Sequence, residues 1–481
     1  MKAQIRTILV ILLISASISF IVFAKYHQPS TESIIELRKD NFYPRELTIQ
    51  KDGTVKFISK TRGFWPASDI HPAHGIYPEF DPGKPIKGGG SWSFRFDEAG
   101  EWKYHDHLAP YFTGKIIVED TGGKATEVPG NNDCKRLHSH VYCWQEELLA
   151  VLEEEGIDAL FDYLSVMFNR DSDFKLYCHH ITHNVGIAVY PYFLKDKDSV
   201  LTPKASACGN GFYHGFMEAL LSANLDPEEA SEFCKYIDKK LTPDAPDAAL
   251  QCYHGIGHGA MDMAIIYGNS VEDEKALMDP ALEICRDASE TEDQLYRCAS
   301  GVFNGIANFY VTGEYGLTIN EEDPLWLCRD QPEEYKRSCY GNMNSAIYWH
   351  SGNDFSKSMR YVENIDDDAE EISAIKYLAA LASIYEGQNT ADIIDSCRLL
   401  QDHLRLPCIR GFAHGFLEHG PPGTEYEEAL IFCRSDLLTQ KEKDACFQYA
   451  LNLGGWYSKE KVKEICKAVE EEYRKYCQIN L

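Results

Sequence analysis

Five potential metal ligands lie close together in the N-terminal part of the chain: His71, His74, His105, Asp106 and His107. Imidazole and carboxylate donors without sulfur suit Cu(II), Zn(II) or another divalent ion. We expect one site built from some of these histidines, with copper as the first choice and Asp106 as a ligand or as the group that orients one. The alternative is a domain without metal, whose histidines only form hydrogen bonds within loops.

A second set of histidines belongs to a motif that recurs along the rest of the chain. The template C-x-x-G-x-x-H-G begins at Cys208, Cys252 and Cys408. Degenerate copies begin at Cys298, Cys339 and Cys446, a histidine-rich variant begins at Cys178, and residues 374–387 occupy the place of a copy without cysteine. Successive copies are 30 to 46 residues apart, which is the length of a helical hairpin in solenoids and α/α toroids. The repeats therefore predict an all-α region of stacked hairpins.

Each complete copy, judged by its spacing, carries an acidic residue about one helical turn after its histidine. The pairs are His214 with Glu218, His258 with Asp262, and His414 with Glu418, and His179 and His183 have the same separation. If the helices converge, these side chains line a cavity suited to zinc or another divalent ion, or to general acid/base chemistry. Alternatively, each imidazole is structural and hydrogen-bonds a carbonyl of the neighbouring repeat.

The first group of ligands must be positioned by β-strands. Segments that alternate apolar and polar residues occur at 47–49, 54–57, 92–96 and 115–118, and glycine, proline and aspartate separate them. This pattern is typical of an antiparallel β-sandwich. Because side chains alternate between the two faces of a strand, His105 and His107 should share one face and Asp106 should lie on the other.

Residues 30–120 resemble the cupredoxin family, through Phe42-Tyr43-Pro44, Gly53 and the run 100–105 before the histidine loop. In small cupredoxins of the amicyanin type, the last loop supplies a cysteine, a histidine and a methionine. Counted back from the glycine at 114, those positions hold Asp106, Ala109 and Phe112. A type 1 copper centre needs a thiolate and two imidazoles. The resemblance therefore implies the fold and a copper-related role without a blue-copper site.

The sixteen cysteines all follow residue 133, and they mark the remainder of the chain as a separate region. We predict disulfides that join the end of one helix to the start of the next: Cys234–Cys252, Cys285–Cys298, Cys328–Cys339, Cys397–Cys408, Cys433–Cys446 and Cys466–Cys477. Cys134, Cys143, Cys178 and Cys208 remain unassigned. Zinc binding by these cysteines is a weaker alternative, because the pairs lack the short spacing of zinc knuckles.

The helices of this region fall into two classes by composition. Segments 212–221 and 257–267 are apolar nearly all round and predict inner helices, whereas 227–239 and 460–476 are amphipathic and predict outer ones. Alternating inner and outer helices form a toroid or a superhelix. The expected fold is thus a multi-domain α+β chain, with a cupredoxin-like sandwich at 30–120, a linker at 121–133 and a disulfide-stapled helical-repeat domain at 134–481.

Composition limits the classes of function. The chain has 481 residues and a net charge of −28, so a nucleic-acid partner would be repelled. Lys2 and Arg6 precede an apolar run at 7–24, which predicts a signal peptide or an N-terminal membrane anchor at 1–24. Together with the cysteines, this run predicts an extracytoplasmic protein whose membrane contact, if any, is made by that segment.

Three hypotheses follow for the function. The first is an exported metal-binding protein that handles copper. The second is a metal-dependent extracytoplasmic enzyme, a hydrolase or an oxidoreductase, with its site in the helical cavity. The third is a structural surface protein without metal. No nucleophile motif, phosphate loop, haem-attachment sequence or dinucleotide fingerprint is present, so the sequence leaves the reaction, the substrate and any protein partner open.

Overall fold

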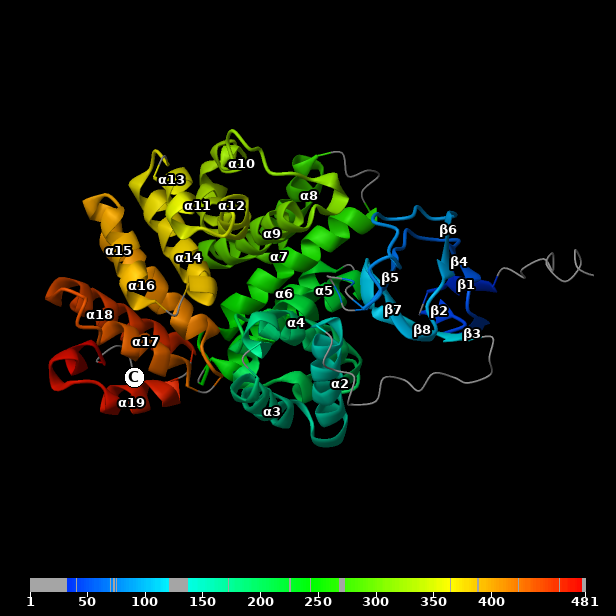
Figure 1. Ribbon diagram of the computed structural model, residues 1–481, viewed down its shortest axis with the longest axis horizontal. Helices are drawn as coiled ribbons and strands as arrows, with labels where there is room; N and C mark the ends of the chain where they lie inside the picture. The colour runs from blue at the N-terminus through cyan, green and yellow to red at the C-terminus, as the bar shows by residue number, and fades with distance from the viewer. Residues whose placement is uncertain are drawn as a thin grey trace, which may run out of the picture.

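A computed structural model describes residues 33–477 except 40, 70, 72–73, 75, 121–136, 172, 225, 243, 268–272, 364, 387–388, 423 and 458. The predicted signal or anchor at 1–24, the linker at 121–133 and Cys134 lie outside the described residues. Within the described part of the chain, no helix has the length and hydropathy needed to cross a membrane. Figure 1 shows the β-strands at one end of the molecule and the helices in the remainder.

The β-strands form two four-stranded sheets that pack face to face. One sheet has the order β2-β1-β4-β6, with bounds β1 Ser33–Leu37, β2 Phe42–Tyr43, β4 Gly53–Ser59 and β6 Ser91–Phe96. The other has the order β3-β8-β7-β5, with bounds β3 Glu46–Gln50, β5 Pro66–Ser68, β7 Gly100–Asp106 and β8 Ala109–Glu119. The predicted sandwich is therefore present, and its strands coincide with the alternating segments.

The sheets are mixed, whereas the alternating pattern predicted antiparallel ones. β1 pairs with β4 in parallel, and β3 pairs with β8 in parallel. A period of two defines which face of a strand is buried but says nothing about the direction of its neighbour, so this feature was not predictable. Between the sheets lies an aromatic core, in which Phe42, Phe57, Phe80 and Tyr104 are fully buried.

The helices follow one another in an arc of inner and outer layers. The inner helices are α4 Phe174–Phe193, α5 Gly211–Asn224, α7 Ala248–Tyr267, α9 Glu292–Thr312, α11 Glu333–Asn342, α12 Asn344–His350, α14 Asp368–Glu386, α16 Asp402–His419 and α18 Gln440–Tyr457. Lys175 on α4 lies 3.7 Å from Glu428 on an outer helix near the far end of the arc. The first inner helix therefore lies near helices of the last repeats, and Gly209 before α5 likewise lies next to His419 at the end of α16.

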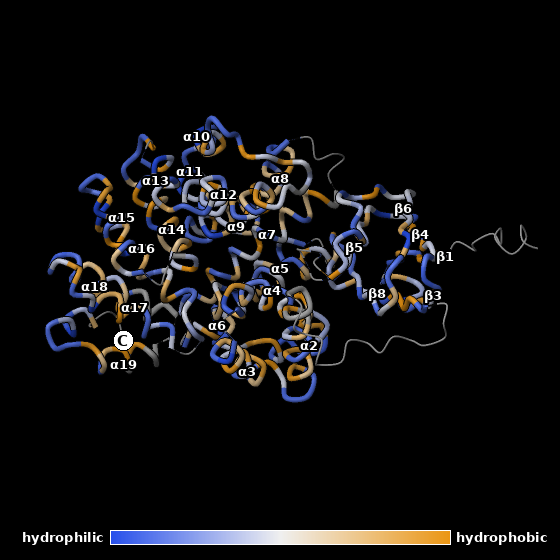
Figure 2. Tube along the Cα trace, in the orientation of Figure 1, coloured by the Kyte–Doolittle hydropathy of each residue, from blue (hydrophilic) through white to orange (hydrophobic). Residues whose placement is uncertain are grey.

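The outer helices are shorter or amphipathic, and they cover the inner layer. They are α2 Leu137–Glu155, α3 Ile157–Arg170, α6 Pro227–Leu241, α8 Glu274–Ala288, α10 Trp326–Arg329, α13 Phe355–Val362, α15 Thr390–Leu399, α17 Glu425–Cys433 and α19 Lys459–Ala468. Short 3-10 turns lie at Lys197–Val200, Pro203–Ser206, Glu314–Gly316 and Glu471–Cys477. Figure 2 shows hydrophobic and hydrophilic residues alternating along α3, as expected of an outer helix.

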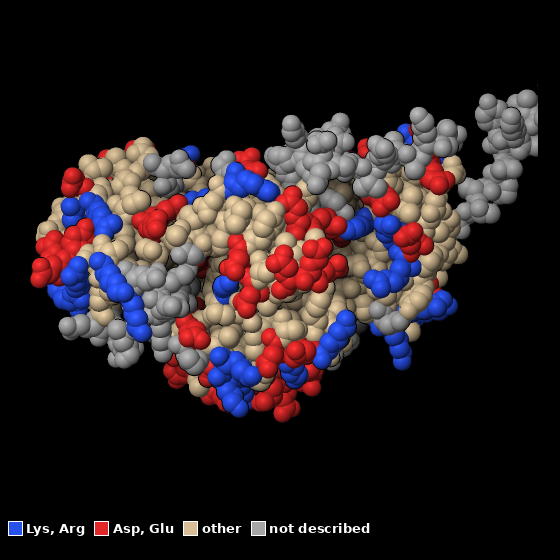
Figure 3. Space-filling view, turned by 90° about the horizontal axis from the view of Figure 1, so that it is seen from below, with Lys and Arg blue, Asp and Glu red and all other residues tan. Residues whose placement is uncertain are grey.

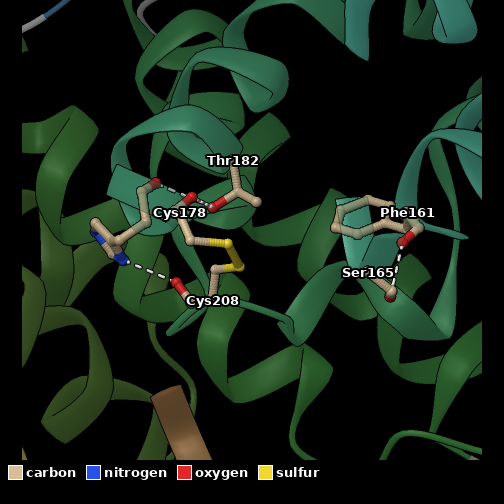
Figure 4. Close-up of a disulfide and its surroundings, with 6 residues drawn as sticks. Phe161, Ser165, Cys178, Thr182 and Cys208 are labelled. Atoms are coloured by element: carbon tan, nitrogen blue, oxygen red, sulfur yellow. Dashed lines mark hydrogen bonds between the residues drawn. A yellow bond between two sulfur atoms is a disulfide. The ribbon is translucent and has the colours of Figure 1, made fainter. Parts of the chain in front are cut away.

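Seven disulfides in the described part of this region link neighbouring elements along the chain. All six predicted pairs are present. Cys178 and Cys208, which the sequence left unassigned, form the seventh, and Figure 4 shows this bond with Thr182 donating a hydrogen bond to the carbonyl oxygen of Cys178. Cys143 is also disulfide-bonded. This density of disulfides is consistent with an extracytoplasmic protein.

The sandwich packs directly against the helices. Trp65, Ala67 and Leu108 of the sandwich belong to the apolar core of the helical region, and the rings of Tyr111 and Tyr190 lie 5.6 Å apart. On the outside, the face in Figure 3 carries groups of acidic side chains over the helical region, in keeping with the net charge of −28. The contact with the sandwich brings the two sets of histidines to the same interior.

Candidate metal centre

Four histidines of the sandwich converge at its contact with the helices. His105 is in β7, His107 follows that strand, and His71 and His74 lie in the loop after β5. Strand pairing places β5 beside β7, with Ala67 opposite His105, so the loop begins next to the histidines of the strand. Each of the four residues can offer one ring nitrogen such that these atoms all lie within 4.8 Å of one another.

The inward ring nitrogens are in direct contact. His71 Nδ1 lies 3.2 Å from His105 Nε2, and His74 Nε2 lies 2.9 Å from His107 Nδ1. All four residues are buried. His74 has a φ of 48°, in the left-handed region that few residues other than glycine adopt. The imidazole of His74 therefore points towards the other three from a strained backbone conformation.

Three of the four rings present their second nitrogen to a carboxylate. His74 Nδ1 lies 2.7 Å from Asp81, His105 Nδ1 lies 3.1 Å from Asp69, and His71 Nε2 lies 3.6 Å from Glu218. A carboxylate on the outer nitrogen fixes the tautomer and the ring orientation of a metal-binding histidine and makes it a better donor. The arrangement thus has the outer groups as well as the inner donors of a metal site.

Burial favours the neutral form of His71, His105 and His107. Desolvation lowers the pKa of His71 to about 3, despite the hydrogen bond with Glu218. Desolvation also lowers the pKa of His105, and it lowers that of His107 well below its ordinary value. A neutral imidazole has a free lone pair, which is what a metal ion requires.

Asp106 faces away from the four histidines, as the alternation along β7 predicted. Its carboxylate accepts hydrogen bonds from Arg62 and from the backbone N–H groups of Trp65 and Leu108. It is completely buried. Asp106 therefore positions the loop that follows β7 and directs none of its oxygen atoms into the cluster, so the ligand role considered for it finds no support in the geometry.

A type 1 copper centre does not fit these residues. The cysteine position holds Asp106, and the methionine position holds Phe112, whose ring lies under the guanidinium of Arg62 at 5.0 Å. Residues 25–120 contain neither cysteine nor methionine. Blue-copper chemistry requires the thiolate, and a charged pair between Arg62 and Asp106 stands in its place.

The helical region contains a cavity of about 1200 Å³, and both sets of histidines line it. His71 and His107 reach it from the sandwich, and His183, His214 and His258 reach it from α4, α5 and α7. The sandwich therefore closes one side of a space that the inner helices surround.

Of the histidine–acid pairs predicted from spacing, some are in contact and others have different partners. His414 Nε2 lies 3.5 Å from Glu418, as predicted. Glu218 instead contacts His183 of the neighbouring helix at 3.1 Å, and His71 of the sandwich. His258 and Asp262 both line the cavity. One partner on the adjacent helix α4 and one in the sandwich thus replace the partner one turn away in the case of Glu218.

The remaining predicted residues divide between the two interpretations that the sequence left open. His179 Nδ1 contacts the backbone carbonyl oxygen of Cys208 at 3.1 Å, which is the structural role. His183 is four residues further on, and it stacks on His71 of the sandwich with ring centroids 5.7 Å apart. The described contacts thus direct the two rings to different neighbours, His179 to the backbone of Cys208 and His183 to the sandwich.

Sequence reasoning missed four residues of the site: Asp69, Asp81, Asn184 and His254. Asn184 donates a hydrogen bond of 2.8 Å to the backbone oxygen of His71. His254 lies with His214 and His258 in a second cluster, again with ligand atoms within 4.8 Å of one another. Its spacing of four residues from His258 was a usable signal, since the same spacing drew attention to His179 and His183.

Glu418 lies on another part of the cavity wall. Desolvation raises its pKa to about 7, and Asp247 adds to the effect. The imidazoles nearest to it, His414 and His419, lie 3.5 Å and 3.8 Å away. Burial lowers the pKa values of both, that of His419 to about 4. This carboxyl is therefore an acid that can gain or lose a proton near neutral pH.

Solved structures similar to this chain cover about a fifth of it. The amicyanin of Paracoccus versutus is 23% identical over 20% of this chain and 87% of its own, with a TM-score of 0.17. The copper-containing nitrite reductase of Thermus scotoductus is 22% identical over 18% of this chain and 22% of its own, with a TM-score of 0.16. No known family and no curated protein matches the sequence.

Proposed function

We propose that this protein binds a transition-metal ion, copper in the first place, through His71, His74, His105 and His107. The observation that carries the proposal is the convergence of four buried imidazoles whose ligand atoms lie within 4.8 Å of one another. The donor set contains nitrogen and no sulfur, so it favours Cu(II) over Cu(I) and also accepts Zn(II).

The charges around the cluster support a divalent ion. Asp69, Asp81 and Glu218 each contact an imidazole of the cluster, and these carboxylates offset the charge that an ion brings into a buried site. The ion is reached from the helical cavity, since His71 and His107 line that cavity. An exported copper-binding protein would therefore hold its ion where the two regions meet, and any anchoring by the N-terminal segment belongs to the same proposal.

The rival to metal binding is a cluster of imidazoles that only hydrogen-bond one another. Copper bound per chain, measured after incubation of the full-length protein with Cu(II) and removal of unbound ion, separates the two. We expect His105→Ala combined with His107→Ala to lose one copper ion per chain. His350→Ala is the matched control, because this histidine lies outside both clusters and outside the cavity lining. Equal copper in the double variant and the wild type would refute the proposal.

A second candidate function is a metal-dependent enzyme, a hydrolase or an oxidoreductase, and Glu418 is the observation that favours it. A carboxyl with a pKa near 7 in the same cavity is suited to general acid/base catalysis. Hydrolysis of p-nitrophenyl esters by copper- or zinc-loaded protein would then depend on an ionisation near pH 7 and would fall in Glu418→Gln. A rate equal to that of free metal ion would argue against hydrolysis at this site.

A further inference from the structure

A second cluster of imidazoles lies on the cavity wall, formed entirely by the helical region. His214 is on α5, and His254 and His258 are on α7. The ring of His214 lies 4.9 Å from that of His254 and 4.4 Å from that of His258, and one ligand atom from each residue lies within 4.8 Å of the others. Nothing in this set belongs to the sandwich.

The template glycines explain why these rings meet. A Cβ atom on Gly255 would collide with the carbonyl oxygen of Tyr213, so α5 and α7 are in backbone contact at this level. His254 and His258 are four residues apart and share a face of α7. Close approach of the helices then places His214 beside that face. The repeated motif thus specifies the helix contact, and two adjacent copies together supply the three donors.

One of these nitrogens is buried without a hydrogen-bond partner. His258 is 8% exposed, and its Nε2 atom has no partner among the described residues. A buried polar atom left unpaired costs about 1–3 kcal/mol, so native structures rarely retain one without a reason. A metal ion on the cavity side would accept the lone pair of this nitrogen and so supply the missing partner.

The second cluster is connected to the first through two residues. The ring of His183 lies 6.4 Å from that of His214 and 5.7 Å from that of His71. Glu218 contacts both His183 and His71, and it follows His214 by one turn on α5. An unbroken series of imidazoles and one carboxylate therefore runs along the cavity wall from the sandwich to α7.

We propose that His214, His254 and His258 bind a second divalent transition-metal ion, with an open coordination position that faces the cavity. Three imidazoles and one open position are the arrangement of catalytic rather than structural metal sites. Cu(II) and Zn(II) are the ions that suit these donors. The open position takes water or a small anionic ligand from the cavity. This site is independent of the proposed function, because it uses no residue of the sandwich.

The test uses Cu(II) as the probe and the full-length chain. We expect two copper ions per wild-type chain, one in His254→Ala combined with His258→Ala, one in His105→Ala combined with His107→Ala, and two in His350→Ala. In the wild type, only His183 and Glu218, of the described residues, separate the two clusters. Two Cu(II) ions bound there broaden each other's electron paramagnetic resonance lines by dipolar coupling. Either double variant should give narrower lines with hyperfine splitting from nitrogen.

The outcomes separate the two proposals. A wild type that binds one copper ion, retained in the α7 double variant, overturns the second site. Loss of one ion in the α7 variant with no loss in the sandwich variant supports the second site and refutes the first. Because two alanines in a buried helix could unfold the region, His254→Gln is measured alongside, with near-ultraviolet circular dichroism as the check on folding. Copper retained at two ions per chain in both folded α7 variants also overturns the second site.

Discussion

The sandwich and the helical region gather imidazoles by different means. In the sandwich, four histidines from one strand end and one loop meet at a single point, and outer carboxylates orient three of them. In the helical region, histidines recur along a repeated motif, and among the described residues those on the neighbouring helices α5 and α7 bring their ligand atoms within 4.8 Å of one another. His414 carries the same motif on α16 and contacts Tyr449 at 3.0 Å instead. The repeated motif places a histidine on several helices, but only histidines on neighbouring helices can bind the same ion.

Buried carboxyl groups show the same contrast. Asp106 in the sandwich is paired with Arg62 and with two backbone N–H groups. Glu418 in the helical region has imidazoles nearest to it, whose pKa values burial lowers. Burial raises the pKa of both carboxyl groups, but Arg62 and two backbone N–H groups oppose this effect at Asp106, whereas Glu418 has no such hydrogen-bonded cation among the described residues and its pKa rises to about 7. The sandwich therefore uses its buried acid for structure, and the helical region keeps one that can exchange a proton.

The largest expected effect comes from breaking the charged pair of the sandwich. Arg62→Ala leaves the fully buried Asp106 without its cation, and removal of one partner of a buried pair typically costs about 3–5 kcal/mol. Arg95→Ala is the control, because its pair with Asp52 is exposed and is worth less than about 1 kcal/mol. Urea unfolding followed by tryptophan fluorescence measures both. Equal losses in the two variants would contradict the role assigned to Asp106.

The unpaired acid of the helical region should make stability depend on pH. An unfolded Glu418 loses its proton near pH 4.5 and a folded one near pH 7, so the folded state binds more protons between these values and stability falls as the pH rises. The free energy of unfolding lost in this way is at most about 3 kcal/mol. This value is an upper limit because the side chain is 24% exposed and solvent screens its charge. Melting temperatures of the metal-free protein from pH 4.5 to 8 measure it. Glu418→Gln should remove this part of the pH dependence. Parallel curves of melting temperature against pH for the variant and the wild type would contradict the role given to Glu418.

The helix contact beneath the second cluster gives a smaller effect on stability. Gly255→Ala forces α7 away from the carbonyl oxygen of Tyr213 and should cost about 1–3 kcal/mol, with loss of the copper ion assigned to α7. In Gly305→Ala the new Cβ atom meets only Met261 Cγ at 3.4 Å, so this change should be neutral or stabilise the helix by up to about 1 kcal/mol. Thermal unfolding and copper content are the measurements. A tolerated Gly255→Ala that keeps two copper ions would contradict this account.

The smallest expected effect tests the residue that the two regions share. Glu218 is on α5 but contacts His71 of the sandwich, so Glu218→Gln should weaken copper binding by the sandwich about 10- to 100-fold. Glu232→Gln, an exposed change on α6, should leave it unchanged. Competition with a chelator of known affinity measures the difference. Unaltered affinity in Glu218→Gln would show that the helices are not part of the sandwich site.

The sequence predicted local features well. Alternation along 100–107 placed His105 and His107 on the face opposite Asp106, and cysteine spacing identified six of the seven disulfides whose two cysteines are both described. It could not predict the parallel pairs β1–β4 and β3–β8 or the bond between Cys178 and Cys208. The direction of a neighbouring strand, and a cysteine partner 30 residues away, depend on contacts that no short pattern records.

The sequence by itself determined which side chains share a face: the period of a strand and the turn of a helix fix these relations within a few residues. Only the tertiary structure decided which faces meet. His71 and Asn184 are 113 residues apart, and Glu218 joins His71 and His183 because the sandwich packs on α4 and α5. The free energy of that packing comes from many apolar side chains, including Trp65 and Leu108, whose hydrophobicity is visible in the sequence but whose partners are not.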